Sequence, residues 1–167
     1  MNRIALVFTF LLVAFCHLSC ENEQNTEFQS IGFEEEKAAI LATVHNETKS
    51  AFQRDYAEWT KYWIHRSNAS KTYINFHDST FSETIGWVAI SGFVKTFIDE
   101  NPEPETVPAL SSDVKIRLYG NGAWVSYEQV DSARGLKRET RLMEKVDGKW
   151  KISGMHTTIY GHSQEAY

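Results

Sequence analysis

The sequence predicts a single α+β domain, and two observations carry that prediction. Apolar residues recur at spacings of three and four between residues 33 and 63 and again between 85 and 99, which is typical of helices with one buried face. In the last third of the chain, apolar and polar residues alternate between glycine-containing turns, which predicts antiparallel strands. Helices followed by a run of strands form an α+β order. The 167 residues are enough for one domain with a sizeable core.

The first long helix is expected to begin near Phe33. Three glutamates follow directly, where negative charge is stabilised by the positive end of the helix dipole. A break near Asp55 divides the helical pattern into a long and a short piece. The residues expected along its apolar face are Leu41, Val44, Thr48, Phe52, Tyr56, Trp59 and Trp63.

A short strand over residues 72–77 and a second helix over about 85–99 are expected next. Three prolines then mark an extended connection over residues 102–108, because proline cannot continue a helix. The residues expected on the apolar face of the second helix are Trp87, Ile90, Phe93, Val94, Phe97 and Ile98.

Strands are expected to fill the rest of the chain. Residues 114–118 alternate, and Gly120-Asn121-Gly122 is a strong hairpin turn that leads into a strand over 123–130. Another strand covers 136–145, Asp147-Gly148 turns the chain, and the last strand covers 150–159. These strands are therefore expected to form an antiparallel meander.

The first twenty residues resemble the export signal of bacterial lipoproteins. Arg3 precedes an uncharged apolar run over residues 4–16, which is shorter than the roughly 20 residues of a membrane-spanning helix and suits a signal peptide. Leu18-Ser19-Cys20 resembles the lipobox, in which the cysteine is acylated and becomes the first residue, although His17 stands where leucine is usual. An ordinary cleaved secretory signal and a retained anchor are the alternatives.

This N-terminus sets the expected organisation of the chain. A signal peptide over residues 1–19 is followed by the lipidated Cys20 and a polar, flexible tether up to residue 32, and the α+β domain covers 33–162. The lipid is expected to hold the protein in the cell envelope, on the periplasmic side or at the cell surface. Because Cys16 lies in the signal, the mature domain has no disulfide and depends on its own packing.

Composition excludes several function classes. The net charge is −5 and the chain has no basic run, so it lacks the electrostatic signature of a nucleic-acid-binding protein. No phosphate-binding glycine loop or nucleophile elbow is present, and no cofactor is expected. No metal site is expected either, because the histidines of the mature chain show no ligand spacing and no cysteine is available.

The end of the chain resembles the nuclear transport factor 2-like superfamily, which includes polyketide cyclases, ketosteroid isomerases and the kinase association domain. The resemblance lies in residues 140–152, Thr-x-Leu-Met-x-Lys-x-Asp-Gly-Lys-Trp-Lys-Ile, followed by His156, and residues 55–63 resemble the short second helix of that fold. It covers roughly residues 33–160. It implies a cone-shaped, cystatin-like domain, in which a curved antiparallel sheet wraps the long helix and leaves a pocket at the open end. It also implies that a homodimer could form through the outer sheet face.

The direction of His156 depends on strand parity and hairpin register. Trp150, Ile152 and Gly154 share its parity, so His156 is expected to point into the cone, either as an acid or base or as a structural core histidine. Its partner is Glu139 if the hairpin loop has four residues and Thr140 if it has three. A one-residue slip exchanges the faces. The resemblance favours the second register, with Arg138 and Thr140 pointing inward.

The resemblance also suggests an isomerase-type base. Asp78, after His77, follows the first strand where steroid isomerases of the superfamily carry their catalytic carboxylate, although a solvated loop aspartate is the simpler interpretation. The oxyanion-stabilising tyrosine of those enzymes has no counterpart, because its place on the first helix falls near Glu47 and residues 33–54 contain no tyrosine. This departure argues against isomerase chemistry.

The candidate pocket combines aromatic and polar side chains. Either Tyr127 or Glu128 must face inward, because the two residues lie on opposite sides of one strand. The aromatic residues could equally be plain core. The candidate pocket residues are Tyr56, Trp59, Trp63, His77, Trp87, Tyr127, Glu128, Arg138, Thr140 and His156.

Two functions follow from these observations. The first is a lipid-anchored envelope protein whose domain binds a small organic ligand or mediates dimeric interaction without catalysis. The second is an isomerase, dehydratase or cyclase that uses Asp78 or His156 as general base and Arg138 to orient an anionic substrate. The expected partners are the membrane, through the lipid on Cys20, a small molecule and a second copy of the chain.

Overall fold

The structure, a computed structural model, describes residues 32–131 and 134–161. The chain divides into two compact units, Met1–Ala38 and Ala39–Tyr167. Of the first unit, only the beginning of a helix over residues 32–52 is described. The expected signal peptide and Cys20 lie outside the described residues.

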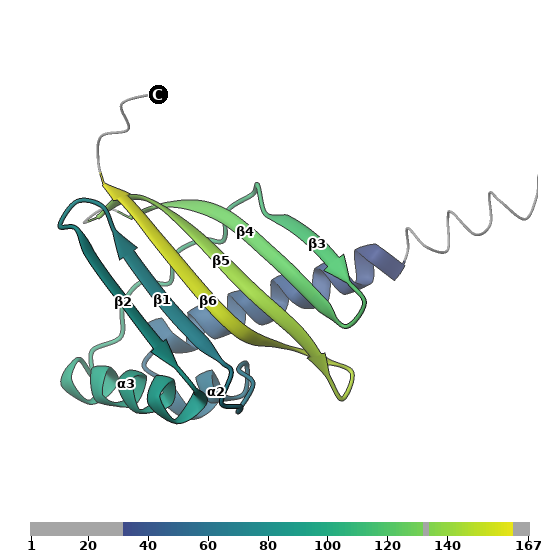
Figure 1. The fold of residues 1–167 in the computed structure, drawn as a ribbon, viewed down its shortest axis with the longest axis horizontal. Helices are drawn as coiled ribbons and strands as arrows, with labels where there is room; N and C mark the ends of the chain where they lie inside the picture. The colour runs from purple at the N-terminus through teal and green to yellow at the C-terminus, as the bar shows by residue number, and fades with distance from the viewer. Residues whose placement is uncertain (1–31, 132–133, 162–167) are drawn as a thin grey trace, which may run out of the picture. The chain divides into compact units, whose positions relative to one another are not determined.

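The second unit holds the rest of this helix and the remaining elements (Figure 1). A tight turn follows the helix, and the carboxylate of Asp55 caps α2 by accepting a hydrogen bond from the backbone N–H of Glu58. The elements after the turn are α2 (Tyr56–Thr60), β1 (Ser70–Asn75), β2 (Thr80–Ile85), α3 (Trp87–Glu100), β3 (Lys115–Tyr119), β4 (Gly122–Asp131), β5 (Gly135–Val146) and β6 (Lys149–Gly161).

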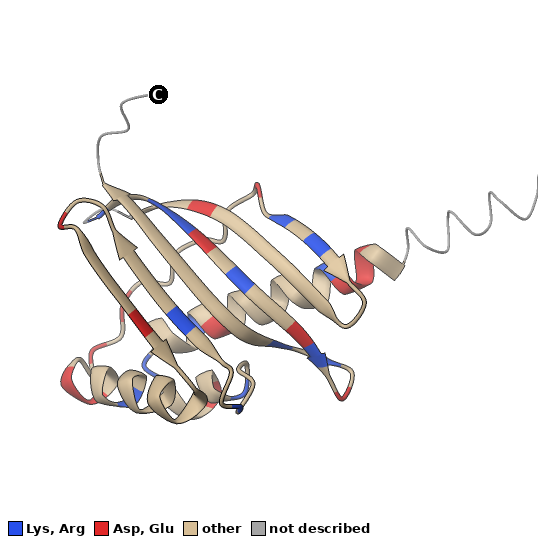
Figure 2. Ribbon diagram, in the orientation of Figure 1, with Lys and Arg blue, Asp and Glu red and all other residues tan. Residues whose placement is uncertain are grey.

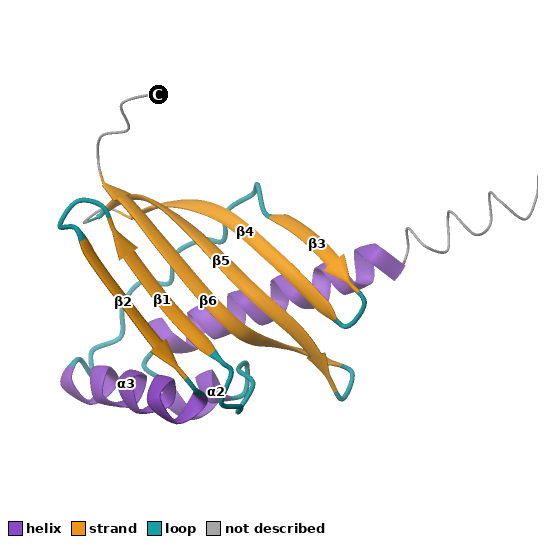
Figure 3. Cartoon of the chain, viewed as in Figure 1, coloured by secondary structure: helices purple, strands orange, loops and turns teal. Residues whose placement is uncertain are grey.

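The six strands form one mixed sheet in the order β2-β1-β6-β5-β4-β3. All neighbours are antiparallel except β1 and β6, which pair in parallel with Thr72 beside His156. The expected α+β class is confirmed, but the sheet is not wholly antiparallel. Figure 3 shows the sheet as a single layer with α2 and α3 gathered at one end of it.

The core of the second unit lies between the helices and one face of the sheet. Ile40 and Val44 from the long helix and Trp59 from α2 are almost fully buried there. α3 contributes three residues at helical spacing, Ile90, Val94 and Ile98. The sheet supplies alternate residues of β4 to β6, namely Ala123, Val125, Tyr127, Met143, Trp150 and Ile152.

The hairpin between β5 and β6 has a two-residue turn. Asp147 and Gly148 both adopt positive φ, 50° and 74°, as a type I′ turn requires. The register changes further along, because Leu142 pairs with Gly154 and Met143 with Ile152, which leaves Ser153 without a partner. Ser153 is therefore the extra residue of a β-bulge.

This bulge reverses the faces of β6. Before it, Trp150 and Ile152 are buried; after it, Thr157 and Ile159 are buried, and His156 is exposed. The expectation that His156 shares the inward parity of Trp150 is wrong, because one inserted residue exchanges the two sides of a strand. His156 does pair with Thr140.

One strand was not expected from the sequence. β2 forms a hairpin with β1 at the edge of the sheet, and five of its six residues are exposed. A strand exposed on both sides lacks the apolar alternation by which strands are recognised.

Candidate functional site

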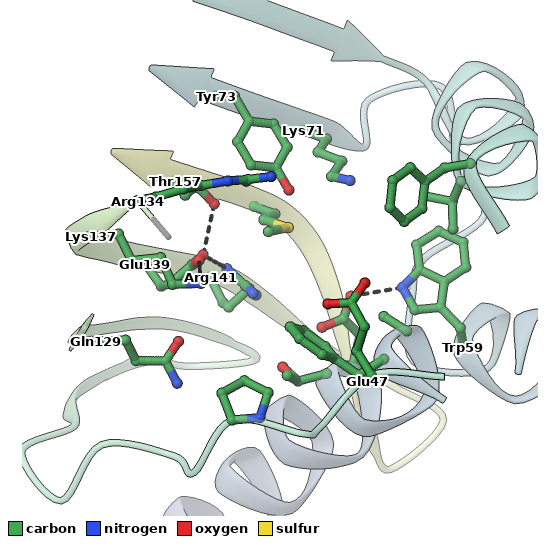
Figure 4. Close-up of a pocket in the computed structure, with 18 of the residues that line it drawn as sticks. Glu47, Trp59, Lys71, Tyr73, Gln129, Arg134, Lys137, Glu139, Arg141 and Thr157 are labelled. Atoms are coloured by element: carbon green, nitrogen blue, oxygen red, sulfur yellow. Dashed lines mark hydrogen bonds and ion pairs between the residues drawn. The ribbon is translucent and has the colours of Figure 1, made fainter. Parts of the chain in front are cut away.

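A pocket of about 700 Å³ lies in the second unit, between the long helix, α3 and the inner face of the sheet (Figure 4). One wall is apolar and comes from Phe93, Val94, Phe97 and Ile98 of α3. The opposite side carries polar and charged residues from β1, β4, β5 and β6. The charged residues that line the pocket are Glu47, Arg54, Lys71, Glu105, Arg134, Lys137, Glu139 and Arg141.

Glu47 places a buried carboxylate at the base of the pocket. It follows Ile40 and Val44 on the buried side of the helix and is only 4% exposed. The indole N–H groups of Trp59 and Trp63 both donate to its Oε1, at 2.8 and 3.2 Å. Neither indole occupies Oε2, so the carboxylate is held in place by one oxygen.

A second buried cluster lies on β5 and β6. Arg141 donates to Glu139 Oε2 at 2.7 Å, and the Thr157 hydroxyl donates to the same oxygen at 2.8 Å. Lys137 Nζ lies 3.2 Å from Glu139 Oε1. Arg141 Nε is buried without a hydrogen-bond partner among the described residues. Figure 2 shows acidic and basic positions following one another along β5.

The charges of this cluster stabilise one another. Burial raises the pKa of Glu139, but Arg141, Lys137 and Thr157 outweigh burial and hold that pKa below its ordinary value of 4.5. Burial lowers the pKa of Arg141, but Tyr127, Glu139 and Glu47 raise it above its ordinary value. Both side chains are therefore charged at neutral pH.

Lys71 and Tyr73 reach the pocket from β1, as Figure 4 shows. The Lys71 ammonium group lies about 5 Å from the rings of Tyr73 and Phe93, 5.1 and 5.0 Å from their centroids. Burial lowers the pKa of Lys71 to about 8 and raises the pKa of the Tyr73 hydroxyl to about 12. Burial likewise raises the pKa of Tyr127, on β4, to about 12.

Arg54 also lines the pocket. Its φ is positive, 63°, in the turn between the long helix and α2, and its guanidinium is ion-paired with Glu105. It also donates to the backbone carbonyl of Asn101 at 2.8 Å. Arg54 thus connects the helix turn to the segment that follows α3.

The predicted aromatic residues divide between the pocket and its support. Trp59 and Tyr127 line the pocket. Trp63 is not part of the lining but is the second donor to Glu47, and Tyr56 and Trp87 stack on Trp59, with ring centroids 6.0 and 5.6 Å away. The aromatic group is therefore mainly core that positions one pocket-lining indole.

His77 and Asp78 lie in the exposed turn between β1 and β2, away from the pocket lining. The Asp78 carboxylate accepts hydrogen bonds from Asn75, at 2.9 Å, and from the backbone and hydroxyl of Thr80, at 3.0 and 2.6 Å. The Thr80 hydroxyl is the main cause that holds its pKa below the ordinary value. Its position matches the simpler interpretation, a solvated loop aspartate.

Glu128, Arg138, Thr140 and His156 lie on the face of the sheet opposite the pocket. Arg138 and Glu128 are cross-strand neighbours that form an exposed ion pair at 2.7 Å. The inward orientation expected for Arg138 and Thr140 is wrong, because Glu139 and Arg141 occupy the inner face of β5.

Sequence reasoning missed most of the polar lining. Glu139 and Arg141 are the alternative set for the inner face, and they occupy it because the bulge at Ser153, which the sequence does not reveal, turns His156 and its partner Thr140 outward. Glu47 offered a signal, because it lies three residues after Val44 on a buried helix face where a carboxylate requires donors. Lys71 and Tyr73 share one side of their strand, but nothing in the sequence identifies that side as internal.

The described residues hold no group of three or more histidine, cysteine, aspartate or glutamate side chains arranged to bind a metal ion. None of the helices within residues 32–131 and 134–161 has both the length and the apolar character to cross a membrane. The pocket residues could hold an anionic group, since five basic and three acidic side chains line it.

No protein-family model and no curated protein matches this chain. Solved structures do match it. A cystatin-like fold protein from Burkholderia xenovorans is 18% identical over 74% of this chain and 91% of its own, with a TM-score of 0.58. A nuclear transport factor 2-like protein of unknown function from Silicibacter pomeroyi is 15% identical over 76% of this chain and 98% of its own, with a TM-score of 0.57. A proposed dehydratase of that family from Streptomyces avermitilis is 11% identical over 75% of this chain and 97% of its own, with a TM-score of 0.58.

Proposed function

From the nuclear transport factor 2-like fold that this chain shares with these structures, we propose that the protein binds a small organic anion with an apolar body in its pocket. The observation that carries this proposal is the charge of the lining. Five basic and three acidic side chains line the pocket of a protein whose net charge is −5. The pocket therefore has the sign opposite to that of the whole chain.

Ion pairs leave part of this positive charge available. Arg54 pairs with Glu105, whereas Arg141 and Lys137 both pair with one carboxylate, that of Glu139. The lining therefore has more basic side chains than carboxylates, and Lys71 adds positive charge against the single remaining carboxylate, Glu47. Because opposite charges attract more strongly away from bulk water, this excess favours an anion inside the pocket.

Size and apolar lining agree with an organic ligand. Pockets for small molecules typically enclose about 300–1,000 Å³ and combine an apolar wall with a few polar groups. This pocket measures about 700 Å³. The α3 wall provides the apolar contact, with Phe93 and Phe97 as its largest side chains.

The proposal favours binding over catalysis by the residues that the sequence suggested. Asp78, Arg138 and His156 are absent from the pocket lining. We further propose that the protein is exported and held at the cell envelope through a lipid on Cys20. That part is supported by the sequence of the first twenty residues.

A matched ligand series tests the anion preference. We would titrate 4-phenylbutyrate, 4-phenylbutan-1-ol and 4-phenylbutylamine into the full-length protein by calorimetry at low salt. The carboxylate is expected to bind at least about tenfold more tightly than the alcohol, and the amine most weakly. The Lys137→Gln variant is expected to lose part of this preference, whereas Arg138→Gln, on the outer face, keeps it. Equal binding of all three ligands would overturn the proposal.

A further inference from the structure

We infer that Lys71 is a nucleophilic amine that forms an imine with an aldehyde or ketone group of a ligand held in the pocket. The inference rests on the proposed function, because it needs a bound organic molecule. Lys71 extends from β1 into the pocket, and the ring of Phe93 on the α3 wall lies beside it. The Lys71 amine and the apolar wall would therefore contact the same ligand.

Lys71 differs from other lysines of the chain in its partners. Lys61, Lys95 and Lys137 each lie within 3.2 Å of a carboxylate oxygen, of Glu58, Asp99 and Glu139 respectively. Lys71 makes no hydrogen bond or ion pair within the part of the chain that the structure describes, and its neighbours are the two aromatic rings. An amine without a carboxylate partner can give up its proton and direct its lone pair at a ligand.

The surroundings of Lys71 favour the neutral amine. Burial is the largest influence and lowers its pKa to about 8, although the carboxylates of Glu47 and Glu139 favour the protonated form. The positive charge of Arg141 adds to the effect of burial. A lysine that is desolvated and near another cation is a recognised form of activated nucleophile.

The reaction balances without an oxidant or reductant. The Lys71 lone pair attacks the carbonyl carbon, so that a C–N bond forms and the carbonyl π electrons move to oxygen. A proton passes from nitrogen to that oxygen and gives a carbinolamine. The C–O bond then breaks, the oxygen takes a further proton and leaves as water, and the nitrogen lone pair completes the C=N bond. Glu47, the buried carboxylate in the same pocket, is the group we assign to carry protons between these atoms.

The test uses 4-formylbenzoate, which combines an aldehyde with the carboxylate that the pocket is proposed to prefer. The full-length protein is incubated with it and sodium cyanoborohydride, which reduces an imine to a stable amine, and the modified lysines are located by peptide mass spectrometry. Lys71 is expected to be labelled at least about tenfold faster at pH 7.5 than exposed lysines such as Lys115. The labelling rate should rise with a midpoint near pH 8.

Variants and a second ligand separate the possible failures. Lys71→Arg should abolish the fast labelling, and Lys95→Arg, at an exposed lysine outside the pocket lining, should leave it unchanged. 4-(Hydroxymethyl)benzoate, which has no carbonyl, should bind and protect Lys71. If 4-(hydroxymethyl)benzoate binds but 4-formylbenzoate labels Lys71 no faster than Lys115, the imine inference is overturned while the proposed function stands. If neither benzoate binds and Lys71 is not labelled, the imine inference and the proposed function are both overturned for this ligand class.

Discussion

Glu47 Oε1 lies 2.8 Å from the indole nitrogen of Trp59, so a buried carboxylate on the long helix is fixed by a tryptophan from α2. Trp63 donates to the same oxygen. This arrangement joins the core to the pocket. Glu47 accepts hydrogen bonds from two buried indole N–H groups, and it also places a negative charge at the pocket base. It explains how a carboxylate is tolerated on a helix face that otherwise packs against the core.

The first prediction concerns the acceptor at Glu47. Glu47→Leu should lower the free energy of unfolding by about 2–4 kcal/mol, because two buried indole N–H groups lose their acceptor. Glu47→Gln keeps a carbonyl oxygen and should cost about 1 kcal/mol. Urea unfolding followed by tryptophan fluorescence measures both. Equal losses for the two variants would show that the indoles do not depend on this oxygen.

The second prediction concerns the buried ion pair on β5. Glu139→Gln leaves Arg141 charged and buried, and it should cost about 3 kcal/mol at pH 7. The matched control is Glu128→Gln, which breaks an exposed pair on the other face and should cost less than about 1 kcal/mol. Chemical denaturation of the three proteins provides the comparison, and similar losses in both variants would contradict the assigned role of burial.

The same pair predicts the response to acid. Because the pKa of Glu139 in the folded protein is below its ordinary value of 4.5, its ionised form stabilises the fold fully above that pH. This contribution is lost as the pH falls from 4.5 through the lower folded value. Glu139→Gln should therefore lose less stability than the wild type between pH 5 and 3. Parallel curves for the two proteins would rule out this carboxylate as an acid-sensitive group.

Much of the fold could be predicted from local sequence, because the residues of the turns mark where strands end and begin. Asp147-Gly148 and Gly120-Asn121-Gly122 join strands close to where the structure has them. The apolar stripe predicted for α3 includes its three buried residues, Ile90, Val94 and Ile98. It also includes Phe93 and Phe97, which line the pocket and are exposed. β2 could not be found, because an exposed edge strand has no buried side to create a pattern.

The site was harder to predict, because it depends on one residue. Ser153 forms a bulge that exchanges the inner and outer faces of β6. The apolar and polar residues alternate regularly on both sides of the bulge, so the sequence does not reveal it. His156 was therefore expected inside, and Arg138 with it, whereas Glu139 and Arg141 occupy the inner face. Lys71 depends on which side of β1 meets the core, and that is decided by tertiary packing.

The third prediction concerns Lys71 and alkaline pH. Its pKa is about 8 in the folded protein and 10.5 ordinarily, so the unfolded chain binds more protons between these values. Its contribution to stability should rise with pH in this window. Lys71→Met should stabilise the protein by about 1–3 kcal/mol at pH 7, and the difference should vanish near pH 10.5. Thermal or urea unfolding at several pH values checks this, and a difference independent of pH would contradict it.

The fourth prediction concerns the proposed lipid anchor. Bacteria expressing the protein and fed a palmitate analogue should incorporate the label into the wild type and not into Cys20→Ser. Cys16→Ser should remain labelled, because Cys16 lies within the expected signal peptide. Equal labelling of wild type and Cys20→Ser would refute acylation at this cysteine.

The most direct test of the proposed function is a crystal structure of the protein with 4-phenylbutyrate. The phenyl ring is expected against Phe93 and Phe97, and the carboxylate on the side of the pocket that carries Lys71 and Lys137. Density for the ligand beside Arg138 on the outer face, with the pocket empty at saturating ligand, would contradict it.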